Sequence, residues 1–154
     1  GEGGCPDDEI RVSSGDYLPG LPKHNLKLGL NWNLNERLRV GTSVLAYSSQ
    51  YVRGNENNRH QPNDEVEGSG KLPGYAVVNL TADYRFARDW TLFGRVDNFF
   101  DKRYATGGAL AENSFVGAGN AFESGPDEWR HEQFIAPGAP RAGWVGVRYR
   151  WDAL

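Results

Sequence analysis

The feature that most constrains the fold is a strict alternation of apolar and polar residues over long segments. Between residues 25 and 34, every even-numbered residue is Leu or Trp, and the odd-numbered residues are Asn, Lys or Gly. Side chains of a β-strand point alternately to opposite faces, so this segment is predicted to be a strand with one apolar and one polar face. No helix is predicted. Four further segments with the same period are predicted strands, at residues 37–52, 74–86, 90–104 and 141–151.

The connections between these strands alternate between short and long. Short turns follow the first and third strands, and long polar or Gly-rich segments follow the second and fourth, at residues 53–72 and 105–139. All short turns then lie at one end of the sheet, as in outer-membrane barrels. Strands of about ten residues suit a tilted bilayer crossing, whereas soluble strands have about five or six. The sequence therefore predicts an all-β chain, a long antiparallel meander of a transmembrane β-barrel with two long outer loops.

The two faces of the predicted strands differ in charge. One face carries Leu, Val, Ala, Tyr and Trp without a charge, and in a membrane barrel it contacts lipid. The other face is expected to point into the lumen, where opposite charges on neighbouring strands form a network. Its predicted lumen-facing charges are Asp83, Arg85, Arg95, Asp97, Arg148 and Arg150. Aromatic residues near strand ends are expected to form interfacial girdles, and they are Trp32, Phe86, Trp90, Tyr104 and Trp151.

Alternation alone leaves a second interpretation open. A soluble β-barrel or sandwich would place the apolar face inside, where it binds a small apolar ligand. The mean hydropathy of -0.65 excludes neither version, because a membrane barrel also alternates apolar and polar residues. The lone Cys5 excludes a disulfide within the chain. A net charge of -3 without a basic block argues against nucleic-acid binding.

The number of strands raises a size problem. Five strands cannot close a membrane barrel, for which about eight is the small limit. Unpaired backbone groups at an open edge are costly in lipid. The chain is therefore expected to be either part of a larger barrel or one subunit of an oligomeric barrel. The first is simpler, because the sequence contains neither Met nor a leader segment.

The long loops carry the candidate ligand-binding residues. Arg and Trp side chains can bind anionic, aromatic-rich compounds. The candidates are Arg53, Arg59, His60, Trp129, Arg130 and His131. The sequence shows no set of potential metal ligands at a fixed spacing that would bring them together, so no metal site and no cofactor are predicted. Catalytic motifs are also not visible, which makes an enzymatic barrel the weakest hypothesis.

Three segments resemble parts of one known family. Residues 98–104, with the sequence NFFDKRY, resemble the Asn-Leu-Phe-Asp-Lys-x-Tyr segment near the end of TonB-dependent outer-membrane receptors. Residues 18–24, LPGLPKH, resemble the approach to a strand several before the last. Residues 137–141, PGAPR, followed by VGVRYRW at 145–151, resemble the final strand. The resemblance covers roughly residues 16 to 151, and Asn98 and Asp101 are interpreted within it as a structural motif at a strand end.

The resemblance implies an architecture and a set of partners. The family barrel has about 22 strands, of which this chain would supply about the last five. Residues 1–21 would be an outer loop and the approach to a strand, 22–151 the C-terminal segment of the barrel, and 152–154 a tail. The family also implies an N-terminal plug domain, the TonB complex, outer-membrane lipid of a Gram-negative bacterium, and a small ligand such as a ferric siderophore taken up actively.

The resemblance further implies an insertion signal at the end of the last strand. The family usually stops at a terminal aromatic residue that the barrel-assembly machinery recognises. The matching residues here are Val147, Tyr149 and Trp151. The sequence departs from the pattern because Asp152, Ala153 and Leu154 follow.

Overall fold

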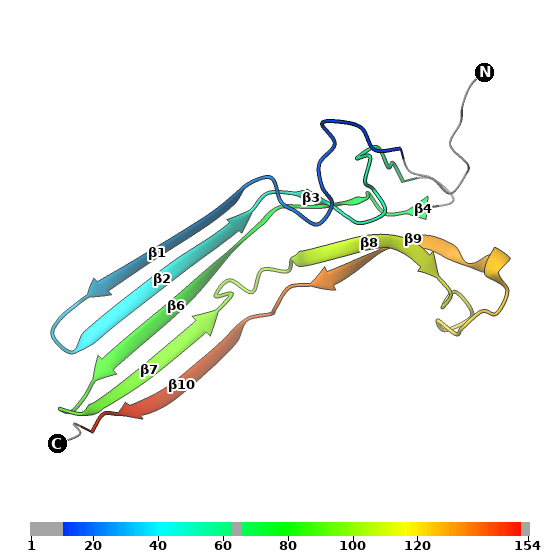
Figure 1. Ribbon diagram of the computed structural model, residues 1–154. Coiled ribbons are helices and arrows are strands. Elements are labelled where there is room, and N and C mark those ends of the chain that lie inside the picture. The colour runs from blue at the N-terminus through cyan, green and yellow to red at the C-terminus, as the bar shows by residue number, and fades with distance from the viewer. Residues whose placement is uncertain (1–10, 63–65, 152–154) are drawn as a thin grey trace. The chain divides into compact units, whose positions relative to one another are not determined.

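The computed structural model describes residues 11–62 and 66–151 (Figure 1). Cys5 and the tail 152–154 lie outside the described residues. The chain forms two compact units. The strand unit comprises His24–Tyr47, Tyr75–Tyr104 and Gly138–Leu154, and the loop unit comprises Gly1–Lys23, Ser48–Gly74 and Ala105–Pro137. In the part of the chain that is described, no helix is long and apolar enough to cross a membrane.

The strand unit is one antiparallel sheet of five long strands (Figure 1). The strands are β1 (Asn25–Asn33), β2 (Leu38–Tyr47), β6 (Tyr75–Arg85), β7 (Trp90–Asp97) and β10 (Ala142–Tyr149). Their order in the sheet is β1-β2-β6-β7-β10, so neighbours in this unit follow one another along the chain. The predicted antiparallel meander of five strands is confirmed.

The register aligns the apolar residues of all five strands on one face. One row pairs Leu30 with Thr42, Thr42 with Leu80 and Leu80 with Val96. The same face stays open to the surroundings, and Leu28 is 54% exposed. A soluble barrel or sandwich would bury this face against a second layer. The exposed apolar face therefore does not favour the soluble alternative.

The second and fourth strands are shorter than predicted. β7 ends at Asp97 instead of continuing to residue 104, because Asn98 and Asp101 adopt left-handed backbone angles with φ of 48° and 52°. Such angles interrupt a β-ladder. β2 ends at Tyr47, and the predicted continuation to residue 52 is instead the separate two-residue strand β3 (Gln50–Tyr51).

The loop unit contains a hairpin that the sequence did not indicate. β8 (Ala105–Asn113) pairs with β9 (Arg130–Pro137), so the predicted long loop 105–139 contains two strands that were not predicted. β8 is rich in small residues and lacks apolar alternation. Its Gly108 is required by close packing, because a Cβ there would lie 2.9 Å from Cγ1 of Val52.

Shorter elements complete the loop unit. β4 (Val66–Glu67) runs parallel to β9, and β5 (Lys71–Leu72) pairs with β3. A single 3₁₀ turn, η1, covers Pro126–Glu128. A small core of Val52, Leu72 and Ala105, with Leu110 packed against it, holds these pieces together. Leu72, at the end of the predicted loop 53–72, is therefore held by contacts with residues outside that loop.

Candidate functional site

The polar face of the strand unit carries an ion pair that crosses a strand. Nη1 of Arg148 on β10 lies 3.8 Å from Oδ1 of Asp83 on β6, with β7 between them. The guanidinium of Arg148 lies 5.3 Å from the ring centroid of Phe93 on β7. Because Phe93 covers Gly146, Arg148 can extend over the aromatic ring to reach the carboxylate.

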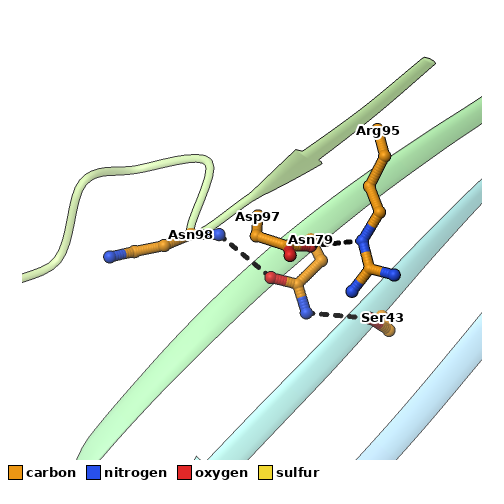
Figure 2. Close-up of polar contacts among 5 residues, drawn as sticks. All are labelled: Ser43, Asn79, Arg95, Asp97 and Asn98. Atoms are coloured by element: carbon orange, nitrogen blue, oxygen red, sulfur yellow. Dashed lines mark hydrogen bonds and ion pairs between the residues drawn. The ribbon is translucent and has the colours of Figure 1, made fainter. Parts of the chain in front are cut away.

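A second ion pair lies within one strand rather than between strands. Nε of Arg95 donates to Oδ1 of Asp97 at 2.7 Å, two residues further along β7 (Figure 2). The Arg95 guanidinium also lies 5.7 Å from the ring of Trp144 on β10. The predicted network between strands is thus represented by Asp83 with Arg148, while Arg95 and Asp97 pair with each other.

Hydrogen bonds extend this polar surface toward β2. Asn79 on β6 accepts from the backbone N–H of Asn98 at 2.9 Å and donates to Oγ of Ser43 at 3.2 Å (Figure 2). Nearer the short turns, Nη2 of Arg85 donates to the carbonyl of Glu36 at 2.7 Å. The backbone N–H of Arg150 donates to the carbonyl of Asp89 at 2.8 Å.

Asn98 links two of the three segments that suggested a family. Its side chain, only 3% exposed, donates to the carbonyls of Lys102 at 2.9 Å and Ala139 at 3.1 Å, and accepts from the N–H of Lys102 at 2.9 Å. Oδ1 of Asp101 accepts from the backbone N–H of Arg141 at 3.1 Å. These contacts fix the chain between β7 and β8 against the approach to β10, as a structural motif would.

Four aromatic residues near the short-turn end form one chain of ring contacts. Ring centroids are 6.3 Å apart for Phe86 and Trp90, 4.8 Å for Trp90 and Tyr149, and 5.6 Å for Tyr149 and Trp151. Val147 shares the apolar face of β10 with Tyr149. Tyr104 differs from the expectation of a girdle, because it stacks on Tyr75 of the polar face at 4.3 Å.

All six candidate ligand residues lie in the loop unit. Three of them, Arg53, Arg59 and His60, belong to the first long loop, where His60 holds the backbone in place. Nε2 of His60 lies 3.0 Å from the carbonyl of Gly68, and its backbone N–H donates to Oδ1 of Asn55 at 3.0 Å. Asn55, 1% exposed, donates to the carbonyl of Gly70 at 3.0 Å. Arg53 is held through its backbone, which exchanges hydrogen bonds with Gly108 and Leu110.

The other three candidates lie at the beginning of β9. Nε1 of Trp129 donates to the carbonyl of Glu123 at 2.8 Å, and Nε2 of His131 lies 3.5 Å from Oε1 of Glu112. Arg130 is the register partner of Asn113 in the backbone pairing of β8 with β9. Within residues 11–62 and 66–151, this group shares no hydrogen bond or ion pair with Arg53, Arg59 or His60. The same residues contain no cluster of three potential metal ligands.

The structure adds a group of four residues that the sequence did not single out. Tyr17 and Tyr51 stack with centroids 6.3 Å apart and an angle of 13° between their planes. Nζ of Lys23 donates to the Tyr17 hydroxyl at 2.8 Å, and Nζ of Lys71 lies 5.0 Å from the centre of the Tyr51 ring. We call Tyr17, Lys23, Tyr51 and Lys71 the Tyr–Lys cluster.

The Tyr–Lys cluster combines aromatic faces with two ammonium groups. The hydrogen bond and the positive charge of Lys23 lower the pKa of the Tyr17 phenol, and the same hydrogen bond raises the pKa of Lys23. Such a group can attract an anionic aromatic compound by charge and stack on it. No sequence pattern indicates this cluster, because only the pairing of β3 with β5 brings Tyr51 next to Lys71.

Comparison with known proteins agrees with this geometry. The family model described as the β-barrel of TonB-dependent receptor-like proteins matches residues 6–99. The ferrienterobactin receptor of Escherichia coli K12 is 32% identical over 114 residues, which cover 70% of this chain and 15% of that protein. The ferric enterobactin receptor of Pseudomonas aeruginosa PAO1 is 32% identical over 116 residues, 73% of this chain and 15% of the relative.

The fold has solved counterparts as well. The ferric-catecholate import receptor Fiu from E. coli K12, in its closed form, superimposes with a TM-score of 0.57 at 19% identity, covering 86% of this chain and 15% of that one. The chain belongs to the TonB-dependent receptor family, and the matched region is the β-barrel. The chain spans about 15% of the length of the curated relatives it matches.

Proposed function

We propose that this chain is the C-terminal part of the barrel of a TonB-dependent receptor that imports a ferric siderophore across the outer membrane of a Gram-negative bacterium. The observation that carries the proposal is the register of the strand unit, which separates an exposed, uncharged face from a charged face on five consecutive long strands. Names of relatives that specify ferric enterobactin and ferric catecholates support the type of ligand.

In this proposal each part of the chain has a place in the whole receptor. The apolar face contacts lipid, and the polar face lines the lumen that the plug domain fills. The outer edges of β1 and β10 pair with strands outside this chain, because open edges are not tolerated in a bilayer. Val147, Tyr149 and Trp151 form the insertion signal for the barrel-assembly machinery, and the TonB complex acts through the remainder of the receptor.

The loop unit supplies part of the surface that captures the ligand. The Tyr–Lys cluster presents stacked rings and ammonium groups, and Arg53, Arg59 and Arg130 add further positive charge. His60 contributes by holding the segment around Gly68 rather than by contacting the ligand. Trp129 and His131 are likewise oriented by Glu123 and Glu112 at the beginning of β9.

Binding to the full-length receptor tests this proposal. Purified receptor is titrated with ferric enterobactin, and quenching of tryptophan fluorescence reports the Kd. We expect saturable binding, and we expect the double variant Lys23→Gln/Lys71→Gln to raise the Kd by about tenfold, since two cation contacts are lost. Lys27→Gln, on the polar face of β1, is the matched control. Absence of binding to ferric enterobactin and to ferric hydroxamate and citrate complexes would refute siderophore uptake.

A further inference from the structure

The polar face contains a strongly basic hollow at the short-turn end of the strand unit. Its volume is about 430 Å³, and it lies among residues of the turns and strand ends. Three acidic residues, Glu36, Asp83 and Asp89, also line it, which leaves a net charge of +3 in a chain whose total is -3. We call it the arginine hollow after the six residues Arg37, Arg39, Arg85, Arg88, Arg148 and Arg150.

Most hydrogen-bonding capacity in the arginine hollow is not used by the other described residues. Arg39 donates through Nε to Oδ1 of Asn33 at 2.9 Å, and Arg85 donates to the carbonyl of Glu36. Each guanidinium retains further N–H donors. Within the described residues, the side chains of Arg37, Arg88 and Arg150 have no hydrogen-bond or ion-pair partner. The acidic residues therefore do not neutralise the hollow.

The hollow lies at the end of the sheet opposite the long connections. Residues 34–37 and 86–89 form the short turns, whereas the chain leaves β2 and β7 for the loop unit at their other ends. A ligand that moves along the polar face from the end where the long connections leave the sheet would reach the arginine hollow last. Arg95, partway along the same face, is neutralised locally by Asp97, so the net positive charge increases toward the short turns.

We propose that the arginine hollow binds the anionic ferric complex during its passage and is a second, transient site near the exit. This inference rests on the proposed function. Deprotonated catecholate oxygens outweigh the charge of the ferric ion, so the complex is an anion. Planar guanidinium groups donate paired hydrogen bonds to such oxygens and are weakly hydrated. Several of them in one concave surface raise the local concentration of an anion.

Uptake and surface binding by the full-length receptor in cells separate this site from the capture site. The variant Arg37→Gln/Arg88→Gln/Arg150→Gln removes the charges that have no side-chain partner among the described residues, and the corresponding triple Lys variant retains them. We expect the Gln variant to lower the maximal uptake rate of ferric enterobactin by at least about threefold with an unchanged surface Kd. The Lys variant retains the charge but not the paired donors, so it should transport at a rate between those of the Gln variant and the wild type. If the triple variant fails to insert into the membrane, the single variant Arg88→Gln, in an exposed turn, replaces it. We expect this variant to lower the maximal uptake rate by a smaller factor.

Three outcomes would overturn the proposal. Unchanged uptake by the Gln variant, with normal surface binding, refutes the transit site alone. A Gln variant that forms an open pore in planar bilayers would instead assign the hollow to contact with the plug domain. Failure of the wild-type receptor to bind a ferric siderophore would refute the proposed function itself, and the transit site with it. The surface-binding measurement distinguishes this last failure from the first.

Discussion

The ring of Phe93 on β7 lies directly over Gly146 on β10, its partner in the register of the sheet. A Cβ at position 146 would lie 2.5 Å from Cζ of Phe93, which is closer than side-chain atoms approach one another. Because glycine has no side chain, the Phe93 ring can lie against the backbone at position 146. Arg148 then extends over the ring to Asp83.

Gly146→Ala is therefore expected to destabilise the barrel by about 1–3 kcal/mol through overpacking. The measurement is the urea midpoint of the full-length receptor in detergent. The double variant Gly146→Ala/Phe93→Ala should be less destabilised than the sum of the two single variants, because the second change removes the clash. Gly29→Ala is the control, since nothing lies within 4 Å of its added Cβ. Equal effects of the two Gly variants would contradict the packing described.

Replacing the buried Asn98 should disrupt the junction before β10. Asn98→Ala leaves two carbonyls and one N–H without a partner and forces Ala into a left-handed conformation, which together cost about 3 kcal/mol. Fewer receptors should reach the folded, heat-modifiable form on gel electrophoresis. Phe100→Ala, at a residue that is 72% exposed, should have little effect by comparison. Normal folding of Asn98→Ala would rule out the structural role.

The contacts of Asn55 and His60 should hold residues 53–62 and 66–72 in place. Without the His60 ring, the carbonyl of Gly68 loses its partner, and the segment becomes easier to cleave. His60→Ala should accelerate cleavage of the intact receptor by trypsin at Arg59 or Lys71, as followed by mass spectrometry. Arg59→Gln alone should not accelerate cleavage at Lys71. If ligand affinity fell in His60→Ala while cleavage stayed unchanged, His60 would be a ligand contact after all.

The pKa of the Tyr17 phenol should be lower than that of an ordinary tyrosine, because the hydrogen bond and the charge of Lys23 favour its anion. A spectrophotometric pH titration of the receptor, with Tyr17→Phe subtracted, isolates this group. Lys23→Gln removes both influences and should raise the Tyr17 pKa toward its usual value. Lys71→Gln is the matched control, because Lys71 lies over Tyr51. An identical titration in the Lys23 variant would exclude the contact.

The strand unit could be predicted from sequence because large apolar residues alternate with polar or small residues along its strands. Leu26, Leu28 and Leu30 specify a strand without any knowledge of the neighbouring strands. The hairpin of β8 and β9 could not be predicted in this way. Gly107, Gly108 and similar small residues carry no alternating pattern. Their extended backbone follows from pairing with β9, and Gly108 also packs on Val52 and Leu72.

The candidate sites show the same contrast. Charges on one face, such as Asp83 and Arg148, follow from period two along each strand, but their pairing depends on Phe93 and Gly146 between them. Loop residues follow no such period. His60 was predicted to contact ligand, and only the fold shows its ring at the carbonyl of Gly68. The Tyr–Lys cluster joins residues far apart in sequence, which no local pattern can indicate.

The most direct test of the account is the environment of two adjacent residues on β1. Nitroxide spin labels are attached to Leu28→Cys and Gly29→Cys in the full-length receptor in lipid vesicles. Their collision rates are then measured with oxygen, which concentrates in lipid, and with a water-soluble nickel complex. The account predicts high oxygen and low nickel accessibility at position 28, and the reverse ratio at position 29. Position 28 exposed to water, or shielded from both reagents as in a protein core, would contradict a lipid-facing apolar surface.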